Sequence, residues 1–288
     1  MIIDFHTHAF PADVAANRGK YFDDKNFAAL YSSPKARLID GSALLEAMDA
    51  SKIDVAVVMG FPWLSEKLCR SQNEYFAALQ NRAAGRLFCF GSAPLYAGKA
   101  ALKSTVREIS AFNLAGIGEA AFYSGFDGKS EKSLDALLEA AFELPVCIHV
   151  NEPVGRTYAG KYEPRFASLY KVISRHNAAT IILAHWGGGL FIYELMQEVK
   201  EAFRNVYYDS AASPYLYDES IFAHAASIAG AGKILFGSDH PLLPFDRCLE
   251  QAERAIKDKK EHGAICGGNA ARLLKIDGNC TDIPRLRL

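Results

Sequence analysis

The sequence predicts a single-domain α/β protein with the architecture of a (β/α)8 TIM barrel. Three observations lead to this prediction. Eight short apolar runs recur along the 288 residues, a segment with apolar residues at three- and four-residue spacing follows each run, and no change of composition divides the chain. We therefore expect one domain over residues 1–288, because a chain of this length can bury a large core.

The eight apolar runs are the predicted strands. Most of them are continuous rather than alternating, which is typical of parallel strands that are covered on both faces. In chain order they cover residues 2–5, 54–59, 87–91, 116–120, 145–150, 180–185, 205–210 and 233–238.

The segments between the strands are the predicted helices. Ser42 suits the N-cap of a helix that runs to residue 50, and a helix over residues 73–84 would end before Gly85. Further helices are expected near residues 99–112, 134–142, 165–176, 190–203, 218–229 and 247–260. An open doubly wound sheet has the same alternation, but no G-x-G-x-x-G follows the first strand.

Two segments are additional to the strands and helices of a minimal barrel. Residues 10–41 are long for a connection between a strand and a helix, so we expect an insertion that folds over the barrel mouth as a lid. Residues 261–288 are expected to add a final helix, ending near Leu274, and a polar tail.

Composition excludes several classes of protein. The 32 basic and 33 acidic residues give a net charge of −1, which argues against nucleic-acid partners and a polybasic membrane surface. No apolar run is long enough to span a bilayer, and the N-terminus lacks the pattern of a signal peptide. The six cysteines show no C-x-x-C spacing. We expect reduced thiols in a cytoplasmic protein.

Polar residues occur where the predicted strands end. In a barrel enzyme this end carries the catalytic groups. Four of the eight histidines fall there, which chance explains poorly. Together with two carboxylates, these histidines make six strand-end candidates: His6 and His8 after the first strand, Glu119 after the fourth, His149 after the fifth, His185 after the sixth and Asp239 after the eighth.

This set of side chains predicts a metal centre. In His6-Thr7-His8 both imidazoles project to the same side of an extended chain, so they can bind one ion together. Imidazoles and carboxylates without paired thiolates suit Zn²⁺, or another first-row divalent ion such as Mn²⁺ or Co²⁺. Such an ion lowers the pKa of a bound water to about 7.

Six segments together resemble the amidohydrolase superfamily, and within it the amidohydrolase-related group often called amidohydrolase family 2. The resemblance implies a metal-bearing barrel whose members hydrolyse, decarboxylate or hydrate small organic acids, esters and lactones. The matching segments, in the family's order, are Ile3-Asp4-Phe5-His6-Thr7-His8, Gly116-Ile117-Gly118-Glu119, Pro145-Val146-Cys147-Ile148-His149, Leu183-Ala184-His185-Trp186-Gly187-Gly188-Gly189, Leu235-Phe236-Gly237-Ser238-Asp239-His240-Pro241 and Gly268-Asn269-Ala270-Ala271-Arg272-Leu273-Leu274.

The resemblance assigns roles to the strand-end residues. By position, His6, His8, His149 and Asp239 are similar to the family's metal ligands. Asp239 would also take a proton from the metal-bound water, as in hydrolytic relatives. His185 is similar to the general acid/base of one-metal members or to the second-ion ligand of two-metal members.

Glu119 is the ambiguous position. A carboxylate here bridges two ions in some relatives, whereas several decarboxylases have no ligand from this strand. Glu119 is therefore either a metal ligand or a hydrogen-bond partner of a ligating histidine. The number of ions, one or two, stays open.

Substrate-binding candidates follow three of the predicted strands. Asn151, Arg156 and Tyr158 lie in the loop after the fifth strand, and Arg156 could clamp a substrate carboxylate or make a local salt bridge. Trp63 and Trp186 could wall an aromatic or apolar substrate, or pack in the core. Residues 187–189, all glycine, either present N–H groups to an anion or form a tight turn.

These features predict an enzyme that acts on a small, anionic substrate. The leading hypothesis is a metal-dependent hydrolase of a carboxylate-bearing ester, lactone or amide. The alternative is a metal-dependent lyase, a decarboxylase or hydratase of an unsaturated or aromatic acid. A non-catalytic, metal-binding barrel is a third reading, which Asp239 and His185 beside the metal argue against. The substrate and the oligomeric state, a homo-oligomer included, stay open.

Overall fold

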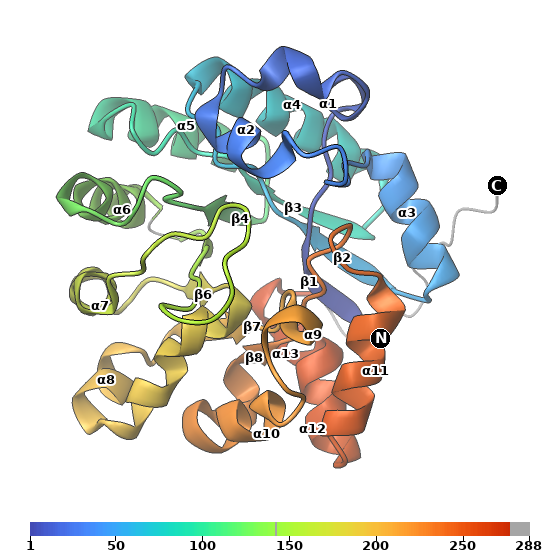
Figure 1. The fold of residues 1–288 in the computed structure, drawn as a ribbon, viewed down its shortest axis with the longest axis vertical. Helices are drawn as coiled ribbons and strands as arrows, with labels where there is room; N and C mark the ends of the chain where they lie inside the picture. Colours follow the sequence, from blue (N-terminus) through green and yellow to red (C-terminus); the bar gives the residue numbers. More distant parts are fainter. Residues whose placement is uncertain (142, 277–288) are drawn as a thin grey trace.

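The computed structural model describes residues 1–141 and 143–276 and arranges eight parallel strands in one sheet, in sequential order. This order confirms the predicted (β/α)8 barrel (Figure 1). All eight strands overlap the predicted runs. They are β1 (Ile3–Thr7), β2 (Val55–Val58), β3 (Leu87–Gly91), β4 (Gly116–Ala120), β5 (Val146–Ile148), β6 (Ile181–Leu183), β7 (Val206–Asp209) and β8 (Ile234–Leu235).

Backbone hydrogen bonds join the two ends of the sheet. The N–H of Asp239 donates to the carbonyl of His6 at 2.9 Å, and the N–H of His8 donates to the carbonyl of His240 at 2.7 Å. Thr7 and His240 also form a parallel bridge. These contacts close the barrel and place β1 beside the segment that follows β8.

Helices surround the strands (Figure 1). The main ones are α3 (Gly41–Ala50), α4 (Glu66–Arg82), α5 (Lys99–Ala111), α6 (Gly128–Ala140), α7 (Phe166–Arg175), α8 (Gln197–Ala202), α10 (Ile221–Ala225) and α11 (Phe245–Ala255). The other helical segments are η2 (His185–Leu195), in which residues 186–189 have non-helical backbone angles, α9 (Ser213–Leu216), η3 (Ala226–Gly230) and η4 (Ala231–Lys233).

Two helices begin earlier than their apolar pattern predicts, because a capping side chain precedes each. The Ser65 hydroxyl accepts a hydrogen bond from the N–H of Leu68, and α4 begins at residue 66 rather than 73. The Asp127 carboxylate accepts from the N–H groups of Lys129 and Ser130, and α6 begins at residue 128 rather than 134.

The strands are buried on both faces, as their continuous apolar runs predict. One apolar cluster fills the barrel and another lies between the sheet and its helices. The five described cysteines are buried and form no disulfide, and burial raises the pKa of the thiols. Within the described residues, no helix combines the length and the apolar character needed to cross a bilayer.

The C-terminal helices close the amino end of the barrel. They are α12 (Lys259–Gly263), η5 (Ala264–Gly268) and α13 (Asn269–Leu273). Ala270, Leu273 and Leu274 pack on the apolar cluster that fills the barrel. The last of these helices ends at Leu273. Most of the predicted polar tail, residues 277–288, lies outside the described residues.

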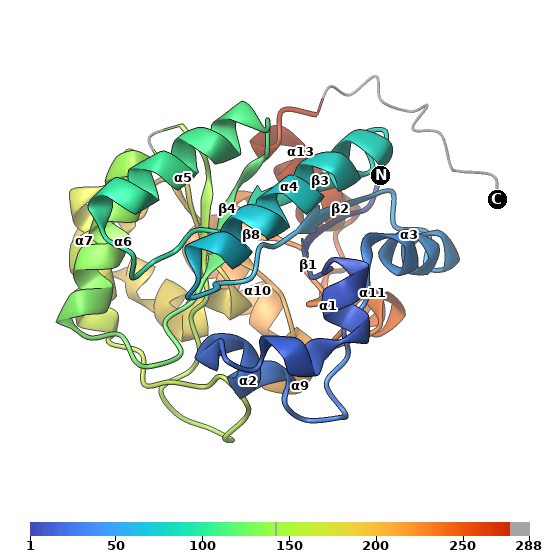
Figure 2. The same cartoon turned by 90° about the horizontal axis from the view of Figure 1, so that it is seen from above.

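The insertion at residues 10–41 forms α1 (Ala12–Ala16), η1 (Arg18–Tyr21) and α2 (Lys25–Tyr31) at the end of the barrel opposite α13 (Figure 2). Its aromatic side chains pack on the loop after β2. Phe27 is fully buried and stacks on Trp63, with ring centroids 4.9 Å apart. The role of this segment as a lid stays a prediction.

Phe27 should anchor this insertion. We predict that Phe27→Ala lowers the free energy of unfolding by about 3–5 kcal/mol, because it leaves a cavity beside Trp63. Urea denaturation measures the change. Val154→Ala is the control, since Val154 is 74% exposed and should contribute little. Equal stability of the two variants would contradict the assignment.

Candidate metal centre

The structure brings the six predicted strand-end residues together at the carboxyl end of the barrel. They come from the ends of five strands, and the parallel sheet gathers them because all its strands end on this face. The residues are His6 in β1, His8 just after β1, Glu119 in β4, His149 after β5, His185 after β6 and Asp239 after β8.

One half of the cluster joins the first and last strands. His6 Nε2 lies 3.2 Å from His8 Nε2, and His8 Nε2 lies 3.0 Å from Asp239 Oδ1. His6 Nε2 is 4.0 Å from the same oxygen. The three side chains are close enough to share one ion.

The other half is built around Glu119. Its Oε1 lies 2.8 Å from His149 Nδ1 and 3.3 Å from His185 Nε2. The same oxygen is 3.8 Å from His6 Nε2, so Glu119 connects the two halves. His6, Glu119 and His185 form a second group that could hold an ion.

Buried negative charge dominates the electrostatics of this cluster. Burial alone would lower the pKa of His6, but the Asp209 and Glu119 carboxylates outweigh burial and raise it to about 9. Burial likewise opposes charge on His185, whose pKa the contact with Glu119 raises to about 10. The pKa of Glu119 itself is well below its usual value: burial would raise it, but His149 and His6 outweigh that effect. The cluster therefore attracts positive charge.

The donor set fits a divalent cation. Two imidazole nitrogens face each other at 3.2 Å, beside carboxylate oxygens, which is how ligands of one ion are placed. Cys147 lies near His6 and Asp209, but burial raises the pKa of its thiol well above the usual value, so a thiolate ligand is disfavoured. Imidazole and carboxylate without thiolate suit Zn²⁺, Mn²⁺ or Co²⁺.

A left-handed turn carries His185 into the cluster. His185 and Trp186 have φ values of +56° and +59°, and residues 187–189 also have positive φ. A Cβ atom at Gly188 would collide with the carbonyl oxygen of Asn151. The glycines therefore meet a steric need, as the tight-turn interpretation predicts.

The two predicted substrate-contacting tryptophans are buried. Trp186 is 0% exposed, and its Nε1–H donates to Ser213 Oγ at 3.0 Å. Trp63 is 2% exposed, and its Nε1–H donates to Gln72 Oε1 at 2.9 Å. Both indoles serve as packing and hydrogen-bonding groups in this structure.

The predicted residues after β5 belong to one long loop. Asn151 is buried, and its side-chain amide donates to the carbonyl of Tyr162 at 2.5 Å. The Tyr158 hydroxyl donates to Glu152 Oε2 at 3.1 Å. The Arg156 side chain is exposed. Asn151 and Tyr158 thus tie the loop together, and the carbonyl of Arg156 accepts from Lys161 Nζ at 3.0 Å.

Two buried carboxylates next to the cluster were missed by the sequence analysis. Asp209 Oδ2 lies 2.8 Å from His6 Nδ1. Asp4 Oδ1 accepts hydrogen bonds from the N–H groups of His6 and Ser238, and burial raises the pKa of Asp4 to about 7. The available signal was an acidic residue inside or at the end of an apolar strand run, since such residues are rarely buried without a partner.

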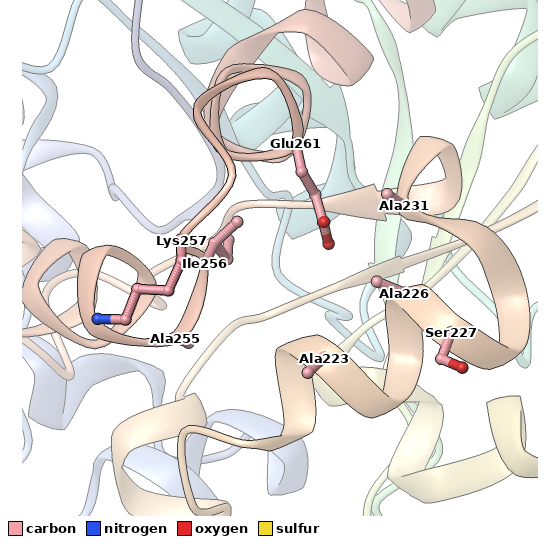
Figure 3. Close-up of a pocket in the computed structure, with 8 residues that line it drawn as sticks. All are labelled: Ala223, Ala226, Ser227, Ala231, Ala255, Ile256, Lys257 and Glu261. Carbon is pink, nitrogen blue, oxygen red and sulfur yellow. The ribbon is translucent and has the colours of Figure 1, made fainter.

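A hollow of about 340 Å³ lies in the outer helical layer (Figure 3). None of the six candidate ligands lines it, and Glu261 is its one acidic residue. Its chemistry therefore does not support a metal site. The lining residues are Ala223, Ala226, Ser227, Ala231, Ala255, Ile256, Lys257 and Glu261.

Comparison with known families identifies the barrel. The family model described as amidohydrolase matches residues 3–276. The chain belongs to the amidohydrolase family. This confirms the resemblance that the strand-end motifs indicated. No curated protein matches the sequence.

Solved structures with the same fold include several decarboxylases. The 5-carboxyvanillate decarboxylase of Sphingomonas paucimobilis has a TM-score of 0.74 and 16% identity over 96% of this chain and 99% of that chain. The 2,6-dihydroxybenzoate decarboxylase of Rhizobium has a TM-score of 0.71 and 17% identity over 96% and 99%. A variant of the Novosphingobium aromaticivorans 5-carboxyvanillate decarboxylase, solved with manganese, has a TM-score of 0.76 and 12% identity over 96% and 97%.

Glu119 should control ion binding. Its Oε1 contacts the imidazoles of three other cluster residues, so removing the charge should weaken their hold on a cation. We predict that Glu119→Gln lowers divalent-ion affinity by roughly 10- to 100-fold, the range for groups that orient or assist ligands. Chelator competition measures the affinity. Glu261→Gln, in the outer hollow, is the control, and an equal affinity of the two variants would disprove the assignment.

Proposed function

We propose that the protein is a divalent-metal-dependent lyase that decarboxylates a small aromatic or unsaturated carboxylate. The observation that carries the proposal is the imidazole–carboxylate cluster at the carboxyl end of a barrel with a decarboxylase-like fold. Those relatives act on 5-carboxyvanillate and 2,6-dihydroxybenzoate. This favours the lyase alternative over the hydrolase that the sequence analysis placed first.

The cluster supplies the groups that such a reaction needs. His6, His8, His149 and Asp239 would hold the cation, and Glu119 and His185 lie beside these residues. When bound, the cation would supply positive charge that binds the substrate's oxygen atoms and stabilises negative charge as the reaction proceeds. Mn²⁺ is a good candidate because two of the similar decarboxylases were solved with manganese.

Decarboxylation also needs a proton. As the bond between the ring carbon and the carboxyl group breaks, a proton must reach that carbon while CO₂ leaves. His185, whose pKa the contact with Glu119 raises against the effect of burial, is the proposed source of this proton. Asp239, whose pKa the contact with His8 lowers although burial would raise it, is the proposed relay, which takes up a proton and passes it on. The His185 Nδ1–H donates to the carbonyl of Ala211 at 3.0 Å, so Nε2 is the atom that handles a proton toward the cluster. Asp239 holds its Oδ1 against His8, and a carboxylate has a second oxygen that can carry a proton.

A second function has one observation in its favour. Glu119 Oε1 contacts groups from both halves of the cluster, as a carboxylate that bridges two ions would. A two-ion cluster suits hydrolysis of an ester, lactone or amide by an activated water. The number of ions per chain therefore bears on the choice, and one ion would favour the lyase.

A substrate panel tests the proposal. Metal-loaded protein should release CO₂ from one or more hydroxylated aromatic acids and should leave lactones, esters and amides intact. Dialysis against a strong chelator should abolish the release, and Mn²⁺ or Zn²⁺ should restore it. Turnover of a lactone or ester without CO₂ release would establish the hydrolase instead.

Asp239 should be essential for the chemical step. We predict that Asp239→Asn, assayed with saturating metal, folds normally and loses kcat by roughly 10²–10⁴, the range of a general acid–base group. Excess metal separates lost proton transfer from lost occupancy. If the variant kept most of its activity, Asp239 would be only a ligand and proton transfer would pass to His185.

A further inference from the structure

A single buried carboxylate, Asp209, holds two of the candidate ligands. It is 0% exposed at the end of β7. Its Oδ2 lies 2.8 Å from His6 Nδ1. Its Oδ1 accepts hydrogen bonds from the backbone N–H groups of His185 and Ala211, both at 3.0 Å. Asp209 thus connects β1, β7 and the turn after β6.

The contact with His6 selects a tautomer. An ionised carboxylate only accepts hydrogen bonds, so the His6 nitrogen that faces Asp209 must donate. With the proton on Nδ1, a neutral His6 has its lone pair on Nε2. That is the atom that lies 3.2 Å from His8 Nε2, inside the cluster.

The contacts of Oδ1 place His185. Asp209 Oδ1 accepts from the backbone N–H groups of His185 and Ala211. The carbonyl of Ala211 in turn accepts from His185 Nδ1. His185 has a φ of +56°, a conformation that is costly for a residue with a Cβ atom and needs support from its surroundings. The same carboxylate therefore directs His185 Nε2 toward Glu119, at 3.3 Å.

We infer that Asp209 is a positioning residue that sets the tautomer of His6 and the placement of His185, so that both Nε2 atoms face one cation. The inference rests on the metal centre and not on decarboxylation. It assigns no contact between Asp209 and substrate.

An asparagine cannot replace Asp209. Its one oxygen can accept from the backbone N–H groups of His185 and Ala211, but its amide N–H₂ then faces His6 Nδ1. His6 must then accept there and carry its proton on Nε2, which blocks the metal-binding lone pair. If the asparagine amide is flipped, its N–H₂ group faces the backbone N–H groups of His185 and Ala211, and these two donors lose their acceptor.

Asp4 offers a matched control. It is also 0% exposed and lies two residues from His6. Its Oδ1 accepts from the backbone N–H groups of His6 and Ser238, and the Ser238 side chain also contacts this carboxylate. Asp4→Asn therefore removes a carboxylate of equal burial and keeps the accepting oxygen, without touching an imidazole.

The test compares Zn²⁺ affinity in wild type, Asp209→Asn and Asp4→Asn by chelator competition, with circular dichroism as the check on folding. We expect Asp209→Asn to bind Zn²⁺ about 10- to 100-fold more weakly and Asp4→Asn to bind it like wild type. The inference is overturned if Asp209→Asn keeps wild-type affinity, if both variants lose affinity equally, or if wild type binds no Zn²⁺.

Nuclear magnetic resonance of the Zn²⁺-loaded wild type gives a second readout, which holds even if Asp209→Asn fails to fold. With ¹⁵N-labelled histidine, His6 should show a proton on Nδ1 and none on Nε2. A proton on Nε2 would overturn the inference. Absence of CO₂ release, by contrast, would defeat the decarboxylase proposal and leave the role of Asp209 intact.

Discussion

The closure of the barrel between β1 and the segment after β8 is the constraint on which the metal centre depends. The N–H of Asp239 donates to the carbonyl of His6, and the N–H of His8 donates to that of His240. These bonds fix the register of two segments from opposite ends of the sequence. Because side chains alternate along a strand, a shift of one residue would turn His6 and His8 away from Asp239. The 3.0 Å contact between His8 and Asp239 is thus a consequence of closure.

The second constraint is the concentration of acidic groups at one end of the barrel. Glu119, Asp209 and Asp239 are all buried there, and a buried carboxylate is costly unless it is paired. Histidines pair with each of them, which raises the pKa of His6 and lowers that of Glu119. A divalent cation would balance the same negative charge while the imidazoles stay neutral, each with one ring proton. Binding of such an ion to the folded state would also stabilise the fold.

Much of this could be predicted from the sequence, because the barrel and its strand ends follow from local patterns. Apolar runs located the strands, and the strand-end rule located His6, His149 and Asp239. The early start of α4 follows from Ser65, a capping signal that the apolar spacing alone does not contain. The position of Asp209 at the end of an apolar run indicates a buried carboxylate, but its partner could not be predicted, since His6 is 203 positions away. The burial of Trp63 likewise depends on Phe27, which belongs to an inserted segment whose packing has no sequence rule.

The most direct test of a metal centre at the strand ends is a crystal structure of Zn²⁺-loaded protein, with anomalous diffraction measured at the zinc edge. The cluster geometry predicts an anomalous peak about 2.0–2.1 Å from both His6 Nε2 and His8 Nε2, with Asp239 completing the group. A protein that binds zinc stoichiometrically but shows no peak between these two imidazoles would contradict the account.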